Sequence, residues 1–149
     1  MYNLMQPGVP SDLISRLAQL PPDATSQWGK MNVSQMLAHC QVPLLVALGE
    51  KQVKSNWMGP LIGGMVKKQM LKDAPFKKNL PTDPAFLVKD ERNFAREHGQ
   101  LWSLLQRFAR ADGNIIVVKK HPLFGEMSPE EWGMLFYKHC DHHFRQFGV

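Results

Sequence analysis

Apolar residues recur every three or four positions along most of this 149-residue chain, which is the spacing of amphipathic helices. The most regular stretch is residues 90–111. Its apolar positions are expected to form one buried face, made of Phe94, Leu101, Trp102, Leu104, Leu105 and Phe108. The charged positions between them, including Glu97, are expected to face solvent.

Two helices are predicted in the N-terminal third of the chain. Residues 11–20 place leucine and isoleucine at helical spacing after Ser11, which can cap the first turn. Residues 1–10 are expected to be a loose arm. Asn32 and Gln35 have the spacing of a capping box and precede a second helix, which is apolar nearly all round from Val42 onward.

The middle of the chain predicts less regular structure. A turn near Trp57 is expected to lead into a short helix over residues 61–71, and the proline-containing segment after it to cross the surface. Residues 112–114 predict a turn at the end of the long helix. Residues 115–118 are interpreted as an extended link, because no partner strand is evident.

Composition and charge exclude several classes of protein. The length predicts a single domain over residues 1–149, and no apolar run reaches the roughly 18 residues of a membrane span. The N-terminus does not resemble a secretory signal, and two distant cysteines make no disulfide framework, so a cytoplasmic protein is expected.

The net charge of +5 comes from one lysine-rich region, residues 51–78. That region contains neither arginine nor the interleaved aromatic residues of nucleic-acid-binding surfaces, so binding of nucleic acid is not expected. Gly63 and Gly64 lie within it. Because the chain has no phosphate-binding P-loop spacing, these glycines are interpreted as points of close helix packing.

The last helix carries the candidate chemistry. Ser128 can cap it, Pro129 occupies its first position, and two acids follow, so its rotational phase can be assigned. In that phase His139 and His143 lie in the middle of the apolar stripe, one turn apart, with Gln146 also inward. His142 falls at the edge of the stripe.

His39 in the second helix supplies a third histidine on an apolar flank, four residues before Pro43. Buried imidazoles need partners, because an unsatisfied buried polar group costs roughly 1–3 kcal/mol. Two interpretations remain open: core histidines bonded to backbone carbonyls, or a metal site formed by His39, His139 and His143. Cys40 and Cys140 are interpreted as buried, inert thiols.

Several motifs resemble the DinB/YfiT-like superfamily of metalloenzymes. They are the stretch from Trp28 to His39, the HPxFG and SPEEWG sequences, and the ending KHxDHHxRQFG, with HxxxH followed by Gln146. The resemblance implies a four-helix bundle, with an extra N-terminal helix, that holds a divalent metal through His39, His139 and His143. It also implies S-transferase or hydrolase chemistry with a low-molecular-weight thiol or water.

Zinc is the default metal for three imidazoles, with nickel and iron as alternatives. His142 and His121 are candidate acid or base groups near the metal, although His121 before Pro122 also suits a structural turn. One functional hypothesis is therefore a metal-dependent enzyme acting on a small molecule. The alternative is a non-catalytic helical protein, a monomer or a homodimer, that binds a metal or a partner.

Overall fold

The computed structural model describes residues 2–54, 59–111 and 115–149, with only the backbone of residues 59–61. The described chain is mostly helical, with a short two-stranded sheet. The helices are α1 (Val9–Leu17), α2 (Val33–Ala47), α3 (Gly59–Met70), α4 (Phe94–Arg110) and α5 (Pro129–Gln146), with a 3₁₀ turn, η1 (Pro84–Phe86), before α4. The predicted all-α class is confirmed at the level of a mostly helical fold.

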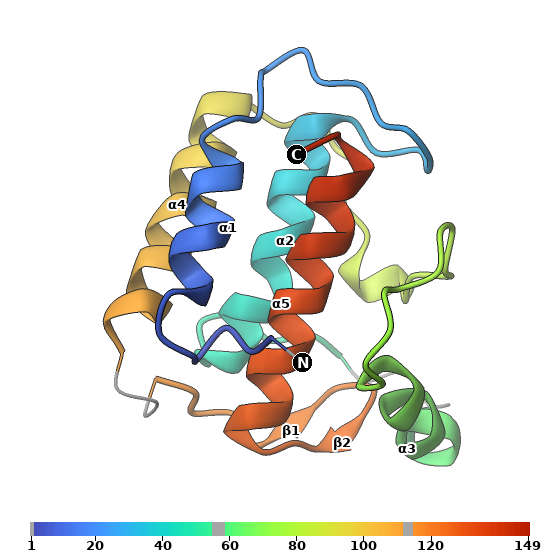
Figure 1. Cartoon of the computed structure of the whole chain (residues 1–149). Helices are drawn as coiled ribbons and strands as arrows, with labels where there is room; N and C mark the ends of the chain where they lie inside the picture. The colour runs from blue at the N-terminus through green and yellow to red at the C-terminus, as the bar shows by residue number, and fades with distance from the viewer. Residues whose placement is uncertain (1, 55–58, 112–114) are drawn as a thin grey trace.

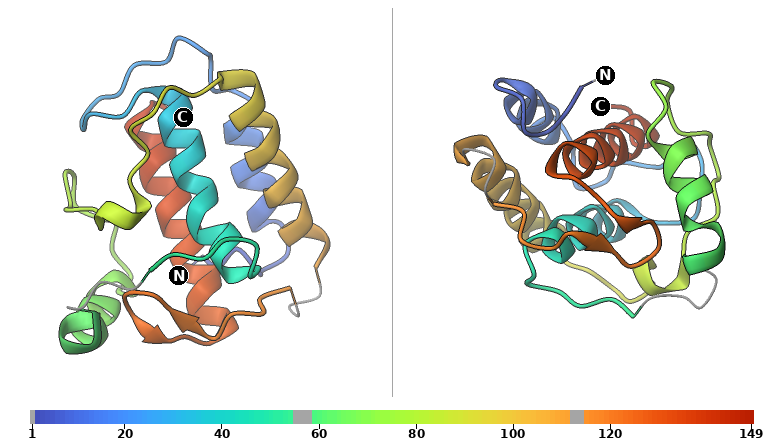
Figure 2. Two further views of the ribbon diagram at one scale, coloured as in Figure 1. Left: turned by 180° about the vertical axis from the view of Figure 1, so that it is seen from behind. Right: turned by 90° about the horizontal axis from the view of Figure 1, so that it is seen from below.

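Four helices pack side by side around the core. Helix α2 contacts α4 and α5, and α1 contacts α4 and α5, while α3 lies apart from them beside the hairpin (Figures 1 and 2). The fully buried side chains come from all four elements and include Leu13, Leu37, Leu105, Phe108 and Trp132. No helix among the described residues is long and apolar enough to cross a bilayer.

Local sequence signals set the two helices that carry the histidines. Both α2 and α5 begin with a complete capping box, Asn32 with Gln35 and Ser128 with Glu131. Helix α2 continues through Pro43 to Ala47. The predicted starts and phases of both helices are therefore confirmed.

The hairpin was not predicted. Its strands are β1 (Lys120–His121) and β2 (Gly125–Glu126), which pair antiparallel across the HPLFG turn. Of the link predicted over residues 115–118, residue 115 lies in a turn and the rest is neither helix nor strand, and the backbone amides of Val117 and Val118 donate to the Ala47 carbonyl. Two-residue strands leave no alternating pattern, so periodicity could not reveal them. The turns predicted at Trp57 and at residues 112–114 lie outside the described residues.

Gly63 confirms the expectation of close packing. A Cβ atom built there would lie 2.1 Å from the Leu123 carbonyl oxygen in the hairpin turn, so only glycine allows α3 to approach. Gly64 has no such neighbour, and the prediction is wrong for it.

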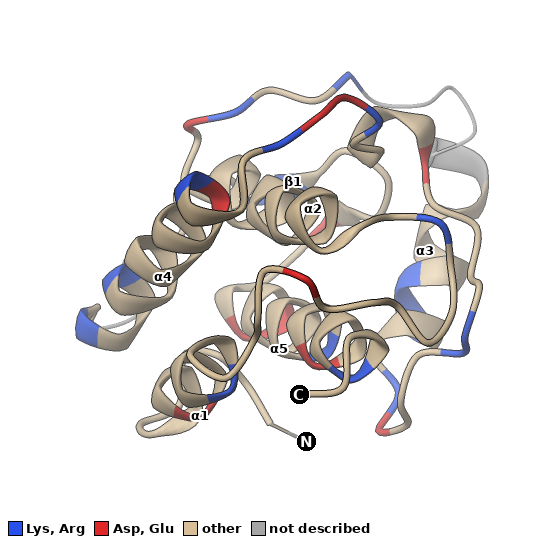
Figure 3. Ribbon diagram, turned by 90° about the horizontal axis from the view of Figure 1, so that it is seen from above, with Lys and Arg blue, Asp and Glu red and all other residues tan. Residues whose placement is uncertain are grey.

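Lysine positions of the basic region lie along α3 and the segment after it (Figure 3). Some of them make defined contacts. Lys67 forms a 2.7 Å ion pair with Glu131 and also donates to the Glu126 carbonyl, while the Lys78 ammonium lies 4.4 Å from the Trp28 ring centroid. These lysines therefore connect α3 and the following segment to the rest of the molecule.

The expectation of a loose N-terminal arm is wrong for residues 3–5. Leu4 is completely buried, and its amide donates to the Gly133 carbonyl of α5 at 3.0 Å. The Asn3 side chain donates to the Glu130 carbonyl and accepts from the Met5 amide. Gly133 permits this docking, because a Cβ there would lie 1.9 Å from the Asn3 Oδ1 atom.

Leu4→Ala is expected to lower the free energy of unfolding by about 2–5 kcal/mol, the usual cost of truncating a fully buried leucine. Val117→Ala, at a side chain that is 64% exposed, should change it by less than about 0.5 kcal/mol. Urea denaturation followed by circular dichroism measures both. Equal, small losses would show that the arm does not pack in solution.

Candidate metal centre

Three histidines meet where α2 packs against α5. The His39 and His139 Nε2 atoms are 2.9 Å apart. Each of the three rings offers one nitrogen as a candidate metal ligand, and these three nitrogens lie within 4.8 Å of one another. Ring centroids are separated by 4.7–4.8 Å in edge-on arrangements. Two of the rings come from successive turns of α5, and the third crosses from α2.

Backbone and amide oxygens fix two of these rings. The Phe86 carbonyl can only accept, so the His39 Nδ1 atom, at 2.9 Å, must donate to it. The His143 Nδ1 atom lies 2.7 Å from Gln146 Oε1, while the Gln146 amide nitrogen donates to the Trp28 carbonyl. With their protons on Nδ1, His39 and His143 each keep a lone pair on Nε2 for a ligand.

His139 differs from its two neighbours. Its Nδ1 atom is buried without a hydrogen-bond partner, and its Nε2 atom faces His39 Nε2. Because the His39 proton is on Nδ1, two nitrogens at this distance are held either by a hydrogen bond from the His139 Nε2–H to His39 Nε2 or by a cation between them. The geometry therefore fits a metal ion, which binds imidazole nitrogen at about 2.0–2.1 Å in the case of zinc.

Burial keeps all three imidazoles neutral near neutral pH. Desolvation lowers the pKa of His143 to about 3 and lowers the pKa of His39. The pKa of His139 falls well below its usual value, first through desolvation and then through repulsion by the neighbouring histidines. Neutral imidazole is the form that binds metals, so no proton needs to be displaced from Nε2 of His39 or His143.

A pocket of about 560 Å³ opens over the three rings. Its wall is formed largely by the segment between α3 and α4, including Phe76, Leu80, Phe86 and Leu87, together with Trp28 from the loop before α2. This wall is attached to the cluster through the bond between Phe86 and His39. The pocket is lined mainly by apolar and aromatic side chains.

The two candidate acid or base histidines both line this pocket. His142 is half-buried against Trp28 and Phe76, and desolvation lowers its pKa. His121 is buried, and its Nδ1 atom accepts from the backbone amides of Leu123 and Phe124, which closes the hairpin turn. Burial lowers the pKa of His121 to about 4. These contacts give His121 a structural role in the turn.

Helix phase alone identified the inward histidines and Gln146, but it missed their oxygen partners. The Phe86 carbonyl belongs to η1 and the Trp28 carbonyl to the loop before α2, and backbone carbonyls carry no sequence signal. The inward position of Gln146, three residues after His143, was the one local sign of a supporting contact.

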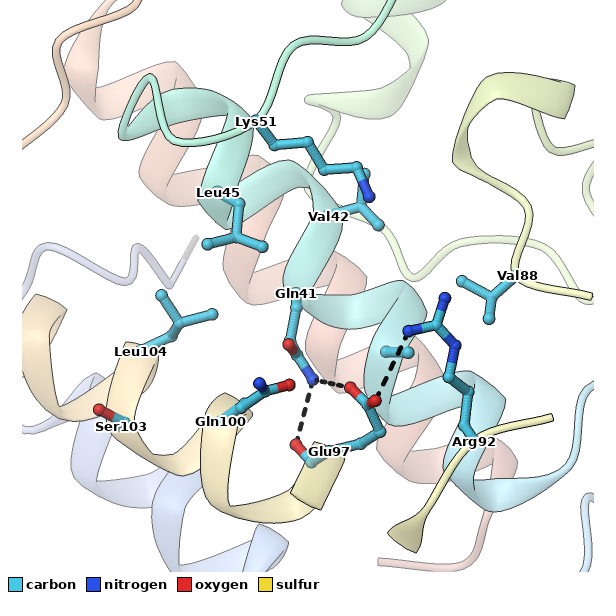
Figure 4. A pocket seen from close by; sticks show the side chains of 11 residues that line it. Gln41, Val42, Leu45, Lys51, Val88, Arg92, Glu97, Gln100, Ser103 and Leu104 are labelled. Atoms are coloured by element: carbon cyan, nitrogen blue, oxygen red, sulfur yellow. Dashed lines mark hydrogen bonds and ion pairs between the residues drawn. The ribbon is translucent and has the colours of Figure 1, made fainter. Parts of the chain in front are cut away.

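A second pocket of about 350 Å³ lies on the other side of α2, against α4 (Figure 4). Glu97 is buried there, although its position in the helical pattern predicted exposure. Its carboxylate accepts from the Gln41 amide at 2.9 Å and lies 3.6 Å from the Arg92 guanidinium. The pocket therefore contains a buried polar contact between α2 and α4, in which the Arg92 Nε atom has no hydrogen-bond partner.

Glu97→Ala is expected to lower the free energy of unfolding by about 1.5–3 kcal/mol, because it removes the buried carboxylate that accepts from the Gln41 amide and pairs with the Arg92 guanidinium. Glu91→Ala, at an exposed position nearby, should cost less than about 0.5 kcal/mol. Chemical denaturation compares the two. Equal stabilities would contradict the buried contact.

Comparison with known proteins assigns the family. Residues 10–148 match the family described as "Protein of unknown function (DUF1569)", so the chain belongs to that family. No curated protein and no solved structure matches it. The resemblance to the DinB/YfiT-like superfamily is therefore wrong as an assignment. The motifs behind the resemblance are short. Two inward histidines one helical turn apart are a common spacing, and they do not identify one family.

Proposed function

We propose that this protein is a metal-dependent enzyme that acts on a small molecule, with His39, His139 and His143 as the metal ligands. The observation that carries the proposal is the convergence of three neutral imidazoles at the wall of a 560 Å³ pocket. Among the described residues, the cluster includes no cysteine, aspartate or glutamate as a fourth ligand. Three protein ligands with one open position are typical of catalytic zinc sites.

The hydrogen bonds around the cluster support this assignment. Metal-binding histidines usually donate their second ring nitrogen to a carbonyl or carboxylate, which orients the ring and strengthens the ligand. His39 and His143 do so through Phe86 and Gln146. Zinc is the expected metal, and nickel and iron are alternatives that imidazole ligands also suit.

The proposed reaction is attack by a water or thiol nucleophile, as in a hydrolase or an S-transferase. A bound divalent metal lowers the pKa of such a nucleophile towards neutrality. His142 lines the same pocket, and its lowered pKa keeps the imidazole neutral and able to accept a proton. The apolar wall excludes water from the substrate and suits an organic molecule with a large apolar part.

The alternative is a non-catalytic protein whose histidines are structural or hold a closed metal site. A fourth protein ligand, or a cluster sealed from solvent, would favour it. The pocket that reaches all three rings favours the enzyme instead.

The first test is metal content. Protein purified without a histidine tag is expected to bind about one zinc ion per chain, and His139→Ala should lose most of this binding, because two imidazoles hold zinc far more weakly than three. Mass spectrometric metal analysis and titration measure it. His98→Ala, at a histidine bonded to the Leu17 carbonyl away from the cluster, is the matched control.

Catalysis is tested on the same proteins with an activated ester, offered with water or a small thiol as nucleophile. Turnover should disappear with a chelator, return with zinc, and be absent from His139→Ala at equal zinc concentration. Stoichiometric metal without turnover would favour the non-catalytic alternative. Absence of metal binding would overturn both the ligand assignment and the enzyme.

Gln146→Leu is expected to weaken zinc binding about 10–100-fold, the usual effect of removing the group that orients a ligand histidine. The substitution leaves His143 Nδ1 and the Trp28 carbonyl without their partner. Gln19→Leu, at an exposed position in the turn after α1, should leave the affinity unchanged. Competition with a chromophoric chelator measures both affinities, and equal values would exclude a role for Gln146.

A further inference from the structure

Two large apolar side chains remain exposed at the pocket over the histidines. Leu80 and Leu87 line this pocket from the segment between α3 and α4, and they are 37% and 38% exposed. The pocket volume of about 560 Å³ falls in the range that holds small organic ligands. Exposed apolar side chains around a concave surface mark a binding site, because they lose contact with water only when a ligand covers them. This wall therefore fits an apolar ligand.

The inner surface of the pocket is aromatic and uncharged. The centroid of the His142 ring lies 5.5 Å from that of Trp28 and 5.9 Å from that of Phe76. The Phe86 ring lies parallel to the His121 ring, with 5.8 Å between their centroids. Desolvation lowers the pKa of both histidines, that of His121 to about 4, so both are neutral near neutral pH. A ligand inside the pocket therefore meets flat, uncharged rings.

The rim of the pocket carries an excess of positive charge. Lys30 and Asp83 are the charged side chains that line the pocket in the described part of the chain. The Asp83 carboxylate accepts from the Ala85 amide at 2.9 Å, at the start of η1. A second ammonium, that of Lys78, lies 4.4 Å from the ring centroid of Trp28 in the pocket wall. Neither lysine forms an ion pair with another described residue, so two cations face one anion at the rim.

We propose that the pocket binds an amphiphilic organic anion, with its apolar body against Leu80 and Leu87 and its anionic group beside Lys30 and Lys78. A hydrophilic anion would leave the apolar wall in contact with water, and an apolar cation would be repelled at the rim. An apolar molecule that ends in a carboxylate satisfies both the wall and the rim. The inference rests on the proposed function only in treating this ligand as the substrate of the enzyme.

Three ligands with one apolar body and different charges test the proposal: phenylhexanoate, phenylhexanol and phenylhexylamine. Each is titrated into the isotope-labelled full-length chain and followed by two-dimensional NMR, with a chelator present so that no contact between carboxylate and metal contributes. The carboxylate is expected to shift the Trp28 indole signal and the amides of residues 76–87. It should bind about twofold to tenfold more tightly than the alcohol, because two exposed ammonium groups contribute modestly. The amine should bind most weakly.

Substitutions separate the effects of charge and apolar surface. The double variant Lys30→Met with Lys78→Met should bind the carboxylate and the alcohol equally, whereas Lys68→Met, at an exposed position on α3 outside the pocket, should keep the preference. Leu80→Ala should weaken the binding of all three ligands by about twofold to tenfold, because apolar contact area is lost. Ile62→Ala, at a side chain on α3 that is 39% exposed, is its matched control.

Several results would overturn the proposal: no saturable shifts with the carboxylate, shifts confined to other surfaces, or equal affinity for the three ligands. If the chelator unfolds the chain, the wild type and the double lysine variant are compared at equal zinc concentration, and equal preference for the carboxylate would then overturn it. Metal content is measured separately. Carboxylate binding by a chain that holds no zinc would remove the enzyme and keep this inference, and zinc binding without carboxylate binding would do the reverse.

Discussion

The contact between α2 and α5 is the constraint on which the candidate site depends. It places the Nε2 atoms of His39 on α2 and His139 on α5 2.9 Å apart. The two helices are separated by about eighty residues of chain, and each is started by its own capping box. A shift of one residue along either helix would rotate its histidine by about 100° and break up the cluster.

Burying three imidazoles in an apolar region is unfavourable unless their nitrogens find partners. The fold supplies two of these partners from outside the helices that carry the histidines. The Phe86 carbonyl comes from η1, and the Trp28 carbonyl acts through Gln146. The segments that orient the rings also wall the pocket, so ring orientation and access to the pocket are set by the same segments.

Other buried polar groups join the helices to one another. Asp141 on α5 pairs with Arg16 on α1 at 2.8 Å, and the Lys138 ammonium donates to the Met70 and Lys72 carbonyls at the end of α3. Glu97 joins α4 to α2 through Gln41. A helical pattern assigns all of these charged residues to solvent. They are buried because a specific partner on another element offsets the cost of desolvation.

The sequence by itself determined what depends on neighbouring residues: the helix starts at Asn32 and Ser128, and the inward phase of His139, His143 and Gln146. Capping and periodicity act within a few turns, so they can be read locally. Only the tertiary structure decided that His39 faces His139 and that Leu4 packs on α5. Those contacts join residues about a hundred or more positions apart, and they are fixed by how whole helices pack.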